Sequence, residues 1–162
     1  MITIRRIRTG EADLYRQARL TSLQDAPFAF SLTYDLALQR SAESWREQAD
    51  RSAQGGDRAT FIAFANALPV GMAALYRLED QTDTGELLQV WVSPEYRGTS
   101  LASDLIDVIF KWARENQFRR VMAGVTKGNA RALQFYIKYG FTIITGSLPN
   151  DSEGVSLVKE VK

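Results

Sequence analysis

The feature that most constrains the fold is an almost continuous apolar run, Glu86-Leu87-Leu88-Gln89-Val90-Trp91-Val92, which stops at Ser93-Pro94. A strand without polar alternation is buried on both faces, which is typical of the centre of a sheet. Residues 101–116 follow with apolar side chains on one helical face, and residues 119–126 return as another strand. These segments predict a β-α-β unit.

The rest of the chain extends this unit to a mixed sheet with helices on both sides, an α/β (α+β) fold. We expect the order β-α-α-β-β-β-α-β-α-β-β within one domain over residues 1–162. Ser41 is the expected cap of the second helix. The other expected segments are strands near 2–7, 60–65, 70–78, 141–145 and 155–161, and helices from 9–13, from 41–45 and over 129–139.

Composition removes several kinds of chemistry. The chain has neither cysteine nor histidine, which excludes disulfides, thiolate nucleophiles, serine-histidine triads and the common Cys/His zinc sites, so we expect no metal. A formal net charge of +1 does not favour binding to nucleic acid or to an anionic membrane. Because no apolar stretch approaches a signal sequence or a membrane span, we expect a cytoplasmic protein.

The turn after the central strand has the properties of a diphosphate-binding loop. Arg97, Gly98, Thr99, Ser100, Leu101 and Ala102 open a helix, whose first amides have no intrahelical acceptor and carry the positive end of the helix dipole. The small residues allow a phosphate to approach, the hydroxyls of Thr99 and Ser100 can donate hydrogen bonds, and Arg97 adds a positive charge.

Two motifs resemble the Gcn5-related N-acetyltransferase (GNAT) family. Residues 97–102 follow its Gln/Arg-x-x-Gly-x-Gly/Ala pattern, with Ser100 in place of the central glycine. Residues 129–141 match Asn-x-x-Ala-x-x-x-Tyr-x-x-x-Gly-Phe at every specified position. The resemblance implies an acetyl-CoA-dependent N-acetyltransferase that acts by direct transfer in a ternary complex, and a homodimer is a reasonable expectation from the family.

The resemblance also implies roles for individual residues. Tyr136 is the expected general acid, or else an aromatic that packs on the sheet. Glu86 is the expected base, activated by burial, or else a solvated strand end. Asn129 either caps its helix or bonds the pantetheine. Trp91 and Val92 are expected to bond the pantetheine through the main chain, beside a bulge near Val92 that splays the strands and supplies an amide for the oxyanion.

The acceptor is not identified by any motif, so a small-molecule amine and a protein amine both stay open. Phe28 and Phe30 either line its pocket or fill the core. Glu79, Asp80, Asp83 and Glu86 form either an acidic mouth for a cationic amine or a solvated loop. The alternative function is a non-catalytic acyl-CoA-binding sensor or interaction module. A nucleotide-binding domain ranks low, because there is no Gly-x-Gly-x-x-Gly motif and no Walker lysine.

Overall fold

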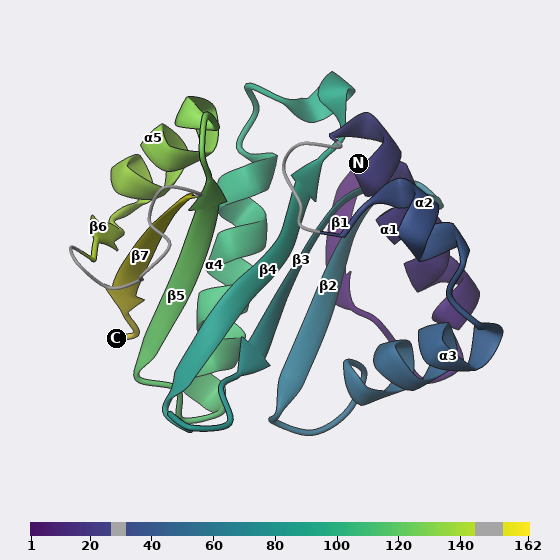
Figure 1. Cartoon of the computed structure of the whole chain (residues 1–162), viewed down its shortest axis with the longest axis horizontal. Helices are drawn as coiled ribbons and strands as arrows, with labels where there is room; N and C mark the ends of the chain where they lie inside the picture. The colour runs from purple at the N-terminus through teal and green to yellow at the C-terminus, as the bar shows by residue number, and fades with distance from the viewer. Residues whose placement is uncertain (27–31, 145–153) are drawn as a thin grey trace.

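A computed structural model describes residues 1–26, 32–144 and 154–162. Within these ranges the chain forms a seven-stranded sheet with the order β1-β2-β3-β4-β5-β7-β6 (Figure 1). The elements are β1 (Ile2–Arg6), α1 (Ala12–Asp25), α2 (Tyr34–Leu38), α3 (Ala42–Arg51), β2 (Arg58–Ala65), β3 (Leu68–Arg77), β4 (Thr84–Val92), η1 (Pro94–Tyr96), α4 (Leu101–Glu115), β5 (Arg120–Thr126), α5 (Ala130–Tyr139), β6 (Thr142–Ile143) and β7 (Gly154–Glu160).

The sheet separates two hydrophobic cores because its strands alternate. On β2, Phe61 and Ala63 face the core that α4 and α5 cover, whereas Ile62 and Phe64 face the core under α1 to α3. The expected mixed α/β architecture is therefore confirmed. Of the helices in the described ranges, none is long and apolar enough to cross a membrane.

The centre of the sheet is divided. β4 and β5 pair in parallel from Thr84 and Arg120 only as far as Leu87 and Ala123. Beyond these residues the two strands diverge, and Figure 1 shows α4 behind the space between their upper ends. The backbone groups of β4 that face β5 consequently have no sheet partner after Leu87.

A bulge in β4 lies where the strands part. Ala74 of β3 pairs with Leu88 and Met72 pairs with Trp91, so β4 contains one extra residue between these pairs. Gln89 lies within the bulge and has a φ of 58°, in the left-handed region. The expectation of a bulge near Val92 was wrong in position, because Val92 pairs regularly with Gly71.

The first helices keep most of their expected features. Ser41 caps α3, since its hydroxyl accepts a hydrogen bond from the Ser44 amide at 3.1 Å. The short helix α2 was not expected, and it is capped in the same way by Thr33. The inner face of α1 carries Tyr15, Ala18, Arg19 and Ser22, so a charged residue occupies a buried position of the helical repeat.

Candidate functional site

A cleft of about 680 Å³ runs through the divided part of the sheet. Its lining comes from both sides: Arg19, Arg40 and Gln48 belong to the α1 to α3 side, and Asn129, Ala132 and Tyr136 to the α5 side. The remaining lining residues are Leu32, Tyr76, Glu86, Leu87, Leu88, Gln89, Val90, Gly124, Val125, Thr126, Gly154, Val155 and Ser156. The separation of β4 from β5 therefore connects the two faces of the sheet.

Tyr136 reaches this cleft from α5. It is only 7% exposed, and its ring packs edge-on against Phe135 and Phe141 at centroid distances of 5.3 Å. Burial raises the pKa of the Tyr136 phenol above its usual value of 10.0, so the hydroxyl keeps its proton at neutral pH. In the described part of the chain no side chain or main-chain group bonds this hydroxyl, which leaves its proton available to a ligand.

Glu86 lines the same cleft from β4. It pairs with Tyr76 on β3 and with Met122 on β5, at the point where the parallel pairing is about to end. The side chain is exposed, so the buried environment expected for an activated base is not present. Within the described ranges its carboxylate makes no ion pair, and it is therefore open to a positively charged group.

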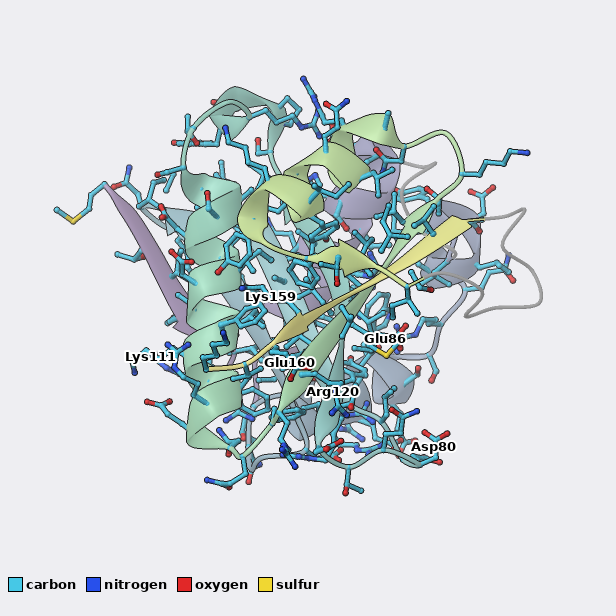
Figure 2. All side chains as sticks on the ribbon, turned by 90° about the vertical axis from the view of Figure 1, so that its left-hand side faces the viewer. Asp80, Glu86, Lys111, Arg120, Lys159 and Glu160 are labelled. Carbon is cyan, nitrogen blue, oxygen red and sulfur yellow. The ribbon has the colours of Figure 1, made fainter. Side chains whose placement is uncertain are left out.

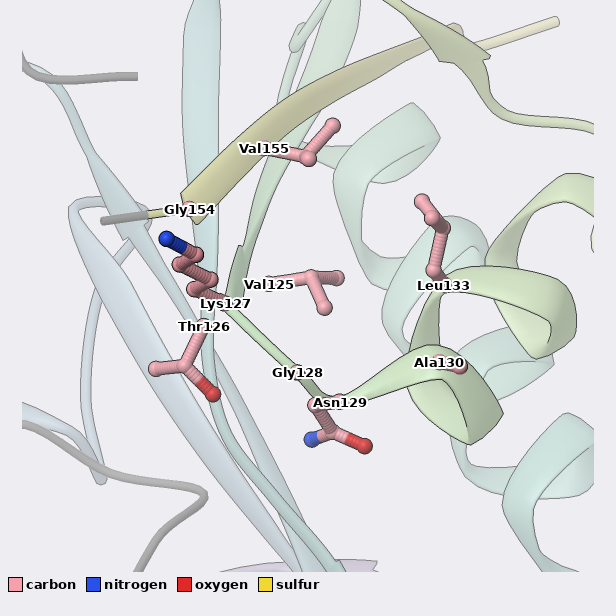
Figure 3. A pocket seen from close by; sticks show the side chains of 9 residues that line it. All are labelled: Val125, Thr126, Lys127, Gly128, Asn129, Ala130, Leu133, Gly154 and Val155. Atoms are coloured by element: carbon pink, nitrogen blue, oxygen red, sulfur yellow. The ribbon is translucent and has the colours of Figure 1, made fainter. Parts of the chain in front are cut away.

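Asn129 caps α5, and its side-chain oxygen accepts a hydrogen bond from the Ala132 amide at 3.3 Å. It also borders a second cavity of about 280 Å³, which adjoins the main cleft (Figure 3). Val125, Leu133 and Val155 form the apolar wall of this cavity, and Lys127 lies at its edge (Figure 3). The capping role of Asn129 is thus observed, and its position also leaves it accessible from the cavity.

The loop before α4 presents the expected anion-binding features outside these two cavities. Gly98 has a φ of 81°, a conformation that residues with a side chain rarely adopt. Ser100 has φ −78° and ψ 0°, which any residue tolerates, so the backbone conformation does not require a glycine there. The first amides of α4 up to Ser103 have no intrahelical acceptor, and that of Leu101 bonds the Thr99 hydroxyl at 3.3 Å.

Arg97 is engaged by protein groups in this structure. Its guanidinium forms an ion pair with Asp25 at the end of α1, and its Nε donates to the Val92 carbonyl at 3.2 Å. The same Asp25 carboxylate accepts a hydrogen bond from Nε1 of Trp91 at 2.9 Å. These contacts tie the loop before α4 to α1.

The expected site residues thus form two groups. Glu86, Asn129 and Tyr136 line one cleft, while the side chains of Trp91 and Val92 and the loop from Arg97 to Ala102 lie outside it. The main chain of Trp91 and Val92 belongs to the stretch of β4 that β5 leaves unpaired. Among the described residues, no group of His, Cys, Asp or Glu could hold a metal ion.

A family comparison covers the elements that build this site. The model of the acetyltransferase (GNAT) family matches residues 20–141, which include β4, the loop before α4, and α5. The chain belongs to the GNAT family.

Relatives agree with this assignment. Uncharacterised N-acetyltransferases of Mycobacterium tuberculosis and Mycobacterium bovis are 36% identical over 86 residues, which are 53% of this chain and 54% of theirs. The match thus spans about half the length of these curated relatives. A GNAT-family acetyltransferase from Streptococcus pneumoniae has a TM-score of 0.81 at 21% identity, with full coverage of both chains. The PaiA N-acetyltransferase of Thermoplasma acidophilum, solved with coenzyme A, has a TM-score of 0.77 at 20% identity and 99% coverage of both chains.

The expected acidic mouth is not present in this GNAT chain. Only Glu86 of the four acidic residues lines the cleft, and Asp83 forms an ion pair with Arg120 at 3.4 Å. Figure 2 shows Asp80 in the loop at the end of the sheet, away from Glu86. Phe28 and Phe30 lie outside the described residues.

Sequence reasoning missed the cationic and tethering residues of this GNAT site. Arg19 and Arg40 line the cleft, and the Tyr15 hydroxyl donates to Oε1 of Gln89 at 3.0 Å, which fixes the bulge to α1. Arg19 occupies a buried repeat position in α1, and Gln89 interrupts an apolar run. Both irregularities are visible in the sequence, and each marks a residue that lines the cleft.

Proposed function

We propose that the protein is an N-acetyltransferase that moves the acetyl group of acetyl-CoA to a primary amine by direct transfer in a ternary complex. One observation carries this proposal: Glu86 and Tyr136 approach from opposite sides of the sheet and line the same cleft. An acid and a base on either side of one cavity are what acyl transfer to an ammonium group needs.

The chain offers suitable groups for the donor substrate. The amides of Ala102 and Ser103 at the start of α4, together with Arg97, suit a diphosphate. The hydroxyls of Thr99 and Ser100 donate to the Tyr96 carbonyl and the Asp104 carboxylate, and they can exchange these bonds for phosphate oxygens. Gly98 gives the loop its left-handed turn without a side chain. The main chain of β4 that β5 leaves unpaired includes Trp91 and Val92, and it suits the amide groups of pantetheine. Asn129 borders the adjoining cavity and can also bond the pantetheine.

The proposed chemistry divides between two side chains. Glu86 accepts the proton of the incoming ammonium group, directly or through water. The neutral amine then attacks the thioester carbonyl, which forms the bond to nitrogen and a tetrahedral oxyanion. The bond to sulfur breaks as this species collapses, and the extra proton on nitrogen passes to water. Tyr136 gives its proton to the leaving sulfur, and its raised pKa keeps that proton in place beforehand. A β4 amide that faces the gap stabilises the oxyanion.

The direct test is an assay of CoA release with purified protein, acetyl-CoA and a panel of primary amines that includes amino acids, polyamines and peptides. We expect thiol release with at least one amine, and acetyl-CoA should raise the melting temperature because a ligand of the folded state stabilises it. The absence of any thermal shift at millimolar acetyl-CoA would exclude acetyl-CoA as the acetyl donor. A thermal shift without thiol release would indicate an acyl-CoA-binding module.

A variant tests the base. Glu86→Gln should remove the acidic limb of the pH profile of kcat/KM and lower its plateau, because glutamine cannot accept the ammonium proton. Identical profiles for the two proteins would remove Glu86 from the mechanism.

A further inference from the structure

Two arginines on the α1 to α3 side of the cleft have no part in the proposed transfer of protons. Arg19 of α1 is only 6% exposed and Arg40, which precedes α3, is half-buried, yet both line the cleft. Both lie on the side opposite α5. The donor-binding features belong to α4, α5 and the gap, so the arginines lie where the acceptor enters.

Arg40 is held in a fixed orientation. Its Nε and Nη2 donate to the Ser44 hydroxyl at 3.0 and 2.9 Å, and its guanidinium stacks on the Trp45 ring at 4.0 Å. No carboxylate forms an ion pair with Arg40 in the described part of the chain. The guanidinium is therefore already fixed in the wall of the cleft before a ligand binds. This lowers the entropic cost of binding an anion.

Arg19 lies near Arg40 through the packing of α1 on α3. Tyr15, one helical turn before Arg19, packs edge-on against Trp45 at 5.7 Å, and the guanidinium of Arg40 covers the same Trp45. Burial lowers the pKa of Arg19, and the positive charge of Arg40 lowers it further by a smaller amount. Nη1 of Arg19 donates to the Ser22 hydroxyl at 3.3 Å, so this side chain is also held in place. Two guanidinium groups in one partly buried wall favour an anionic ligand there.

The opposite charge lies on the β4 wall of the cleft. Glu86 pairs with Tyr76, whose hydroxyl accepts a hydrogen bond from Nε2 of Gln48 at 2.9 Å. Among the described residues, the cleft therefore carries two cations on its helical wall, one carboxylate on its sheet wall, and neutral polar groups between them. A ligand with both an ammonium group and an anionic group matches this arrangement.

We propose that the acceptor is an amino compound with a carboxylate, which Arg19 and Arg40 bind while its amino group lies toward Glu86. The proposal rests on the proposed function and names the substrate class of that site. A carboxylate suits the site better than a phosphate ester, because moving a doubly charged group into a partly buried wall costs more desolvation free energy. Planar guanidinium groups also match the planar carboxylate.

The test compares amines that differ only in the anionic group. Each amino acid is assayed for CoA release beside its decarboxylated amine, its carboxamide and its aminoalkylphosphonate. We expect kcat/KM for the best amino acid to exceed that of its decarboxylated amine at least tenfold. Equal kcat/KM values for the pair, or a preference for the phosphonate or for peptides without a nearby carboxylate, would overturn the inference while leaving the acetyltransferase intact.

Variants locate the effect in the two arginines. Arg40→Gln should raise KM for the amino acid at least tenfold and reduce the preference for the amino acid over its decarboxylated amine by a similar factor. Arg46→Gln is the matched control on α3, since Arg46 is 62% exposed, pairs with Glu43 and does not line the cleft. Arg19→Lys keeps the charge of the buried residue but lacks the planar fork, and should raise KM as well. An unchanged KM in Arg40→Gln would overturn the assignment even if Arg19→Lys fails to fold.

These outcomes separate the two proposals. If no amine releases thiol, the proposed function fails and the acceptor assignment fails with it. If amines react without regard to a carboxylate, only the assignment of Arg19 and Arg40 fails.

Discussion

Tyr136 combines a buried ring with a hydroxyl that bonds no described residue, so its ring and its hydroxyl can be tested separately. Tyr136→Phe keeps the packing against Phe135 and Phe141 but removes the proton that the leaving sulfur needs. We expect kcat to fall about 10²- to 10⁴-fold, the range of positioned acid-base groups, with little change in stability. Steady-state kinetics and calorimetric titration with CoA measure the two effects. Unchanged kcat would make Tyr136 a packing residue only.

Asp25 competes for the arginine that is proposed to bind the diphosphate. Asp25→Asn keeps an oxygen that can accept from the Trp91 indole but removes the charge that pairs with Arg97. We expect CoA to bind roughly two- to fivefold more tightly, because partly exposed ion pairs contribute up to about 1 kcal/mol. Isothermal titration of wild type and variant provides the comparison. Weaker binding would mean that Asp25 holds Arg97 in position for the phosphates.

Single residues also show where sequence reasoning failed. Arg19 and Gln89 stand out in the sequence only as polar interruptions of apolar patterns, and such interruptions usually face solvent. Their roles depend on α1 packing against α3 and on Tyr15 reaching β4, which are contacts between segments far apart in the chain. The local pattern therefore indicates that they are unusual but not why.

At the scale of elements, the turn before α4 contains two small residues, Gly98 and Ser100, whose backbone conformations differ. Ser100→Gly should cost less than about 1 kcal/mol, since the Ser100 side chain makes no capping bond and loses only an exposed hydrogen bond to Asp104, and CoA binding should stay intact or improve. Gly98→Ala should cost about 1–2 kcal/mol, because a side chain is strained at a φ of 81°. Urea unfolding and CoA titration of both variants test this contrast. A marked loss of CoA binding in Ser100→Gly would show that the hydroxyl itself is a ligand.

The regular elements were predicted well because their patterns are local. The apolar run of β4, the amphipathic face of α4 and the caps Ser41 and Asn129 depend on neighbours within a few residues. The bulge was predicted three residues too late, because its position depends on pairing with β3. The short helix α2 was missed because its five residues make too few turns for a periodic signal.

The whole molecule should lose stability in alkali. Burial raises the pKa values of Tyr15, Tyr136 and Tyr139 in the folded state, whereas tyrosines of the unfolded chain ionise near pH 10. Above that pH the unfolded chain binds fewer protons than the folded one, so the free energy of unfolding falls as pH rises. Urea unfolding between pH 8 and about 11 measures this slope.

A matched variant assigns the alkaline effect. Tyr15→Phe keeps the buried ring but cannot ionise, so its stability should fall less steeply above about pH 10 than that of the wild type. Parallel curves would mean that Tyr15 ionises alike in the folded and unfolded chains.

The unpaired edge of β4 has a consequence for how such a protein can change over generations. Under the proposed function, the donor end of the cleft relies largely on main-chain groups, which point mutations do not delete. The acceptor end relies on side chains such as Arg19 and Arg40, and each of these can be exchanged by a single codon change. Descendants of this chain can therefore acquire new acceptors one substitution at a time while they inherit the same donor.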